Sequence, residues 1–162
     1  MTRASIVFVA IAACHNAPAT PPPDPHAVIV DNLVGVWTGN AIGTPFGDFP
    51  FALAFDRKPT GVVHARLDGT PGMYLDFTFD RGKLVEEGAI PNVGTQTHTL
   101  VATTGTHWAD ASVDVDVAVT GDALVMTTLI RGKPHAVFRM QRQTGATAAK
   151  VREAIAARAH SE

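Results

Sequence analysis

Histidine is the residue type in this chain that is best suited to metal binding or acid–base chemistry, and seven histidines are present. His15 and His26 fall in a proline-rich stretch near the start, and His160 is close to the end. The remaining four are His64, His98, His107 and His135. None of them stands in a His-x-His or His-Glu-x-x-His spacing, the local patterns that place two imidazoles on one metal ion. The sequence therefore predicts no metal site.

The carboxylate and hydroxyl side chains give little sign of catalysis. Asp114 and Asp116 alternate with valines, which predicts that they share the wet face of a strand, about 7 Å apart, as solvated surface charge. Glu86 and Glu87 are adjacent, so they point to opposite faces near the end of another strand. No Gly-x-Ser-x-Gly elbow accompanies any serine. We therefore expect a protein that is not an enzyme and holds no cofactor.

Composition places these residues in one ordinary domain. The chain has 162 residues, of which 46% are hydrophobic, enough to bury a core. A formal net charge of −2 gives no basic surface for nucleic acid, so no nucleic-acid partner is expected. No apolar run is long enough to span a bilayer as a helix.

The single cysteine, Cys14, follows a short apolar run and has no internal disulfide partner. Arg3, the apolar residues 6–13 and the small residues before the cysteine are typical of an export signal. The tetrad Ile-Ala-Ala-Cys at residues 11–14 resembles the lipobox of bacterial lipoproteins. That resemblance implies removal of residues 1–13, lipid attachment at Cys14 and anchoring to a membrane. Two alternatives stay open, which are an ordinary signal with an incidental cysteine and a buried core cysteine.

The resemblance also implies a location in the cell envelope. Because His15 rather than aspartate follows the cysteine, the expected product is an outer membrane lipoprotein facing the periplasm or the exterior. Residues 14–27 contain five prolines, which favour a stiff extended chain, so this segment is expected to be a tether.

Alternation of apolar and polar residues predicts strands over the central part of the chain. It is strictest in residues 49–55, 73–79 and 112–119. Other expected strands are residues 36–42, 61–67, 83–90, 96–103, 124–130 and 136–141. Because the turns between them are short, neighbouring strands should pair antiparallel in an up-and-down meander. The fold class expected for residues 28–143 is all-β, a meander of about eight to ten strands closed into a small barrel or folded into a sandwich, with a short α-helix in residues 144–162.

The segment Gly35-Val36-Trp37 resembles the Gly-x-Trp motif that opens the first strand of lipocalin and calycin barrels. The resemblance implies a lipocalin-like barrel in which Gly35 and Trp37 close one end. It also implies that an arginine of the last strand stacks on the tryptophan, with Arg139 as the first candidate and Arg142 as the second. The alternative for Trp37 is an ordinary core aromatic.

The apolar faces of the strands are either core or the wall of a pocket. As a pocket they would bind a small hydrophobic ligand, a lipid or a fatty acid, in a monomeric carrier. The alternative is a barrel with a packed core that binds envelope proteins through its outer face as an accessory lipoprotein. Tyr74 and Trp108 are candidates for a pocket mouth or a partner surface. The expected ligand-binding residues are Phe51, Leu53, Phe55, Met73, Leu75, Phe77, Phe79, Val115 and Val117.

Overall fold

The computed structural model describes residues 25–45, 47–68, 74–80, 82–90, 94–103 and 105–159. The expected signal, the lipidation site Cys14, most of the tether and the candidate ligand residue Met73 lie outside the described residues. Among the described helices none is both long and apolar enough to cross a membrane.

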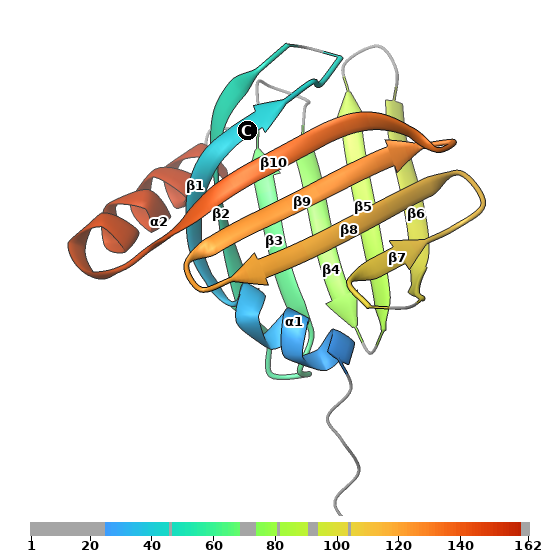
Figure 1. Ribbon diagram of the computed structural model, residues 1–162. Helices are drawn as coiled ribbons and strands as arrows, with labels where there is room; N and C mark the ends of the chain where they lie inside the picture. Colours follow the sequence, from blue (N-terminus) through green and yellow to red (C-terminus); the bar gives the residue numbers. More distant parts are fainter. Residues whose placement is uncertain are drawn as a thin grey trace, which may run out of the picture.

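The molecule is a closed antiparallel β-barrel, which confirms the expected all-β class (Figure 1). Each strand pairs with the next along the chain, and the first strand also pairs with the last. The strands are β1 (Gly35–Ile42), β2 (Phe49–Arg57), β3 (Val63–Asp68), β4 (Tyr74–Asp80), β5 (Lys83–Ile90), β6 (Gly94–Ala102), β7 (His107–Ala109), β8 (Val113–Thr120), β9 (Ala123–Ile130) and β10 (Lys133–Gln143). The short strand β7 is the one that the alternation pattern did not reveal.

The side chains of alternate residues point into the barrel, as the sequence pattern predicted. In β2 the buried residues are Phe51, Leu53 and Phe55, and the residues between them are half-buried. The same period continues through β8, β9 and β10. Trp37, Trp108, Phe55, Phe77 and Phe79 are among the largest side chains that are fully buried. Rows of apolar residues from consecutive strands therefore form one continuous core.

Two helices flank the barrel. Helix α2 (Gly145–Ala159), expected from the sequence, lies outside the barrel against β1, β2 and β3. Val151 and Ile155 on this helix are half-buried, and Arg152 forms a salt bridge with Asp56 of β2 at 2.8 Å. Strands β2 and β3 share only two paired positions, and this helix packs against the outside of both strands.

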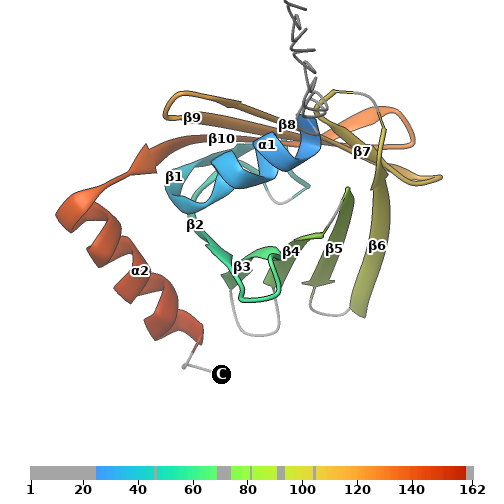
Figure 2. The ribbon, with the colours of Figure 1, turned by 90° about the horizontal axis from the view of Figure 1, so that it is seen from below.

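Helix α1 (Pro25–Leu33) lies across one end of the barrel, seen from below in Figure 2. His26 and Leu33 are its buried residues, and the ring of His26 meets the ring of Trp108 edge-on with centroids 5.1 Å apart. The sequence pattern did not predict this helix, because residues 14–27 were expected to be a tether and residues 28–143 the barrel, with residues 36–42 as its first strand. The β-branched residues Val28, Ile29 and Val30 favour a strand by propensity, but packing on the barrel end stabilises a helix instead.

The second interruption in the wall lies between β6 and β7. Strand β6 is paired with β5 from Gly94 to Val101, but with β7 only at Val101 and Ala102. Residues 94–100 therefore have no ladder partner on the β7 side among the described residues. Helix α1 and Trp108 lie near the other end of β6, so this open stretch belongs to the end of the barrel away from α1.

Candidate functional site

The end of the barrel next to α1 is closed by Trp37 and Arg142. The guanidinium carbon of Arg142 lies 4.2 Å from the centroid of the Trp37 ring, a cation–π contact. The same guanidinium donates hydrogen bonds to the carbonyl oxygens of Val34 at 2.7 Å and Asn32 at 2.6 Å. Trp37 Nε1 donates to the carbonyl oxygen of Leu33 at 2.7 Å. One arginine and one indole thus bind the last turn of α1 to the barrel.

The first candidate for this arginine, Arg139, was wrong. Arg139 is exposed and pairs with Asn40 of β1, whereas Arg142 is directly opposite Trp37. Alternate residues of a strand point to the same face, and Phe138 and Met140 of β10 point inward. Arg142 follows on that inner face, whereas Arg139 points outward. Gly35 lies close to this contact, where an added Cβ would be 2.7 Å from the Arg142 guanidinium, and its φ of +142° also favours glycine.

Two of the residues expected to line a hydrophobic pocket are in ring contact with other aromatic residues of the core. The rings of Phe51 and Phe138 have centroids 5.2 Å apart, and those of Phe79 and Trp108 are 5.5 Å apart. Trp108, a candidate for the pocket mouth, is fully buried. Of the expected pocket residues that the structure describes, Leu75 is half-buried and the following are buried: Phe51, Leu53, Phe55, Phe77, Phe79, Val115 and Val117.

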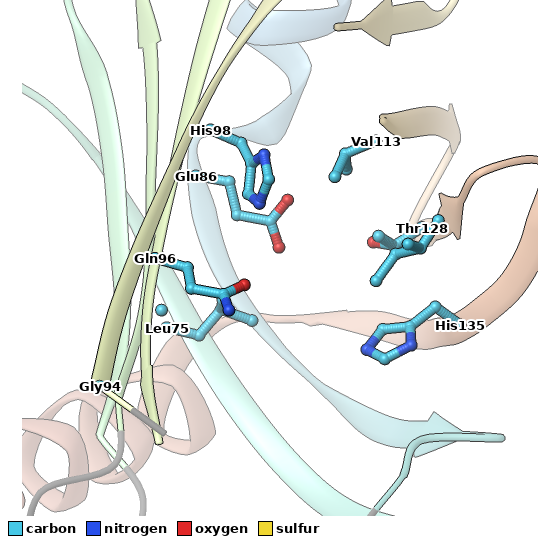
Figure 3. Close-up of a pocket in the computed structure, with 10 residues that line it drawn as sticks. Leu75, Glu86, Gly94, Gln96, His98, Val113, Thr128 and His135 are labelled. Carbon is cyan, nitrogen blue, oxygen red and sulfur yellow. The ribbon is translucent and has the colours of Figure 1, made fainter. Parts of the chain in front are cut away.

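A partly open cavity of about 140 Å³ lies in the barrel beside the open stretch of β6. Five of its lining residues have polar side chains, as Figure 3 shows: Glu86, Gln96, His98, Thr128 and His135. The other lining residues are Leu75, Gly88, Gly94, Val113 and Ile130. Val113 and Thr128 are almost fully buried and form the floor, whereas Gly94, Gln96 and Ile130 are exposed and form the rim.

Strand register places the polar residues on the inner face. Glu86 of β5 is paired with Phe77 on one side and His98 on the other, and both Phe77 and the adjacent inner residue Leu84 are buried. Gln96 precedes His98 by two residues, so it points the same way. In Figure 3 Glu86, Gln96 and His98 project from one wall toward Val113, Thr128 and His135 on the other.

Asp110 holds the ring of His98 in place. Its Oδ1 accepts hydrogen bonds from the backbone N–H groups of Ser112 at 2.6 Å and Val113 at 2.7 Å. These bonds lower the pKa of Asp110 to about 2, so its side chain is a carboxylate at neutral pH. Its Oδ2 lies 3.1 Å from His98 Nδ1. Because a carboxylate only accepts, Nδ1 carries the hydrogen, and the other ring nitrogen, Nε2, is an acceptor whenever the ring is neutral.

Glu86 lies beside His98 without such support. Its Oε2 atom is buried and has no hydrogen-bond partner among the described residues. Burial raises the pKa of Glu86 above its ordinary value, and the nearby His98 opposes this shift. A buried carboxyl group with an unused acceptor is costly to the fold, and such groups often belong to binding sites.

Histidines and aspartates also meet on the outer face. His64 Nε2 lies 2.8 Å from Asp76 Oδ2, and His107 Nε2 lies 3.2 Å from Asp114 Oδ1. Their partly exposed side chains confirm that this face is wet, as the alternation in β3 and β8 predicted. Within the described part of the chain, no group of three His, Cys, Asp or Glu is placed to hold a metal ion.

Sequence reasoning missed the polar cavity. The sequence did contain a sign of it, because Glu86 lies on the same face of its strand as the apolar Leu84. Likewise, Gln96 and His98 lie on the same face as Leu100. Polar residues at inward positions of two neighbouring strands indicate a polar interior surface.

Comparisons with protein-family models, with curated proteins and with solved structures give no match.

Proposed function

We propose that this chain is an envelope lipoprotein whose barrel binds a small polar molecule in the cavity beside β6. The observation that carries this proposal is the inward orientation of Glu86, Gln96 and His98 in a barrel whose other described inner residues are largely apolar. Buried polar side chains destabilise a fold unless they are hydrogen-bonded, and a bound polar molecule supplies the missing partners.

The volume of the cavity favours a small ligand. Pockets for drug-sized ligands measure roughly 300–1,000 Å³, whereas a cavity of roughly 150 Å³ holds a molecule as large as benzene. At about 140 Å³, this cavity suits a ligand of about six heavy atoms. An acyl chain, the ligand expected from the apolar rows, fits the described interior less well because Phe51, Phe79, Phe138 and Trp108 fill it.

A variant that fills the cavity tests this proposal. Gly88 lines the cavity, and an added Cβ would be 3.5 Å from Leu75 Cδ1, an ordinary contact, so Gly88→Val is expected to fold and to occupy the site. The adjacent Ala89 points outward, which makes Ala89→Val the matched control. The ligands are propyl, butyl and pentyl compounds that carry a hydroxyl, amide, ammonium or carboxylate group.

Thermal unfolding in the presence of each compound reports binding, since a ligand at 100 times its Kd stabilises the fold by about 2.7 kcal/mol. We expect at least one compound to raise the Tm of the wild type and of Ala89→Val, but not of Gly88→Val. The proposal is wrong if no compound raises the Tm, or if the effect survives in Gly88→Val. Saturable binding of a fluorescent fatty acid alone would restore the carrier of hydrophobic ligands.

The aromatic packing favours a second candidate, the accessory lipoprotein that binds envelope proteins through its outer face. A filled core is what that candidate requires, and the ring contacts of Phe79 supply it on two sides. Complementation of a deletion strain separates the two candidates. If the protein acts through its outer face, Gly88→Val should rescue the phenotype of the deletion, and if it acts through the cavity, Gly88→Val should fail to rescue it.

The lipid anchor is a separate part of the proposal, supported by residues 11–14. Growth of an expressing bacterium with an alkyne-tagged palmitate should label the wild-type chain, and Cys14→Ala should abolish the label. A label that persists in Cys14→Ala would contradict the anchor and leave the cavity proposal standing.

A further inference from the structure

Two side chains of the cavity, Glu86 and His98, offer hydrogen-bond acceptors. Because Asp110 fixes the hydrogen of His98 on Nδ1, the Nε2 atom of a neutral ring is left as an acceptor. Glu86 offers the buried Oε2 atom, which has no partner among the described residues. Gln96 and Thr128 can each both accept and donate, through an amide group and a hydroxyl group, so they can adapt to the ligand. A ligand rich in N–H donors would satisfy this set.

The charges that surround the cavity point to a cation. The described lining residues include Glu86 but neither lysine nor arginine. Behind His98 lies the carboxylate of Asp110, whose pKa is lowered to about 2. An anionic ligand would face these two acids without a compensating cation, whereas a cation would offset the desolvation of Glu86.

We infer that the cavity binds a small primary ammonium ion, whose N–H groups donate to Glu86 and to Nε2 of His98. This inference rests on the proposed function and specifies its ligand. An ammonium group has three donors and one positive charge, and charge-assisted hydrogen bonds are about twice as strong as neutral ones. The carbon chain of the ligand would contact Leu75, Val113 and Ile130.

Binding of such a cation should release a proton. In the empty cavity burial raises the pKa of Glu86, and a bound ammonium ion would lower it again. Between the ordinary value of 4.5 and the raised value, Glu86 would lose its proton as the ligand enters. The other titratable groups at this site are His98 on β6, Asp110 after β7 and His135 on β10, whereas the described lining residues of β4, β8 and β9 do not titrate.

Three ligands of nearly equal size separate the possibilities: propylammonium, 1-propanol and propionate. Each has four or five heavy atoms, so the tightest Kd expected in this size range is roughly 3 to 40 μM. Calorimetric titration of the full chain at millimolar ligand gives the Kd, and buffers with different ionisation enthalpies give the number of protons released. The variant Glu86→Gln removes the charge with little change of shape. Glu87→Gln, on the outer face of the same strand where Tyr74 donates to Glu87, is the matched control.

We expect wild type and Glu87→Gln to bind propylammonium at least about tenfold more tightly than 1-propanol, to release protons on binding, and to bind propionate most weakly. Glu86→Gln should bind the ammonium and the alcohol within about threefold of each other and should release fewer protons than wild type. Equal affinity of wild type for ammonium and alcohol would overturn the cation inference but leave a polar ligand site. Absence of binding by all three would also overturn the cation inference, and the wider set of compounds in the thermal test would then decide whether there is a polar ligand site. Thermal unfolding of each variant, measured first, establishes that Glu86→Gln is folded.

Discussion

Replacement of Arg142 by alanine should destabilise the fold far more than the same change at Arg139. The Arg142 side chain is 22% exposed, donates to two carbonyl oxygens at the end of α1 and covers the Trp37 ring. Each hydrogen bond contributes about 1 kcal/mol net and the cation–π contact about another 1 kcal/mol. The ion pair with Asp122, at 3.6 Å and with Asp122 78% exposed, adds little.

The expected loss for Arg142→Ala is therefore about 3 kcal/mol, which corresponds to a decrease in Tm of about 10 °C for a domain of this size. Arg139 is exposed, so Arg139→Ala should change the free energy of unfolding by less than about 0.5 kcal/mol. Arg142→Lys keeps the charge but cannot bind both carbonyls in the same planar geometry, so we expect an intermediate loss.

Urea unfolding followed by tryptophan fluorescence measures these differences, because Trp37 and Trp108 are both fully buried and both report the transition. A double-mutant cycle of Arg142→Ala with Trp37→Leu, which removes the aromatic face, should give a coupling energy of about 1 kcal/mol. Equal, small effects at Arg142 and Arg139 would refute the description of the barrel end, as would a larger effect at Arg139.

Three further predictions concern the inner face and the β1–β10 seam. Burial raises the pKa of Glu86, so the wild type should lose stability relative to Glu86→Gln as the pH rises from 4.5 through the raised pKa. Below pH 4 the two proteins should be equally stable. Parallel urea unfolding experiments across this pH range measure the sign of the difference. Hydrogen bonds lower the pKa of Asp110, so the stability that its carboxylate contributes should be present above pH 4 and should disappear as the pH falls through 2. Asp110→Asn should flatten this acid limb, which urea unfolding between pH 2 and pH 5 measures. Gly39→Ala should prevent stable closure of the barrel, because the added Cβ would lie 1.9 Å from the carbonyl oxygen of Arg139. Circular dichroism should show an unfolded or aggregated chain for this variant and a folded chain for the control Gly88→Ala.

Much of the architecture could be predicted from the sequence, because strand periodicity is a local signal. The alternation in β2, β4 and β8 predicted both the strands and their buried faces. Short turns then implied a meander, and the apolar inner face implied a barrel or a sandwich. Helix α1 could not be predicted in this way, since its β-branched residues favour a strand and its stability depends on contacts with Trp108 at the barrel end.

The candidate site depended on relationships across strands. Neither Glu86 nor His98 is unusual in its own segment, and their meeting follows from the register between β5 and β6. The cavity exists because β7 is short and pairs with β6 at two positions only. Pairing of this kind reflects packing of the whole barrel, which the pattern in one segment does not contain. The choice between Arg139 and Arg142, in contrast, could have been made from the sequence. The apolar Phe138 and Met140 mark the inner face of the last strand, and Arg142 lies on that face.

The most direct test of a polar ligand site inside this barrel is the ¹H–¹⁵N spectrum of the protein during titration with propylammonium. We expect saturable shifts at the amides of the cavity residues Gly88, Gln96, His98 and Val113, and we expect these shifts to disappear in Gly88→Val. Shifts confined to outer-face positions such as Asp114 and Asp116, or no saturable shift at any concentration up to 100 times the Kd expected for so small a ligand, would contradict this expectation.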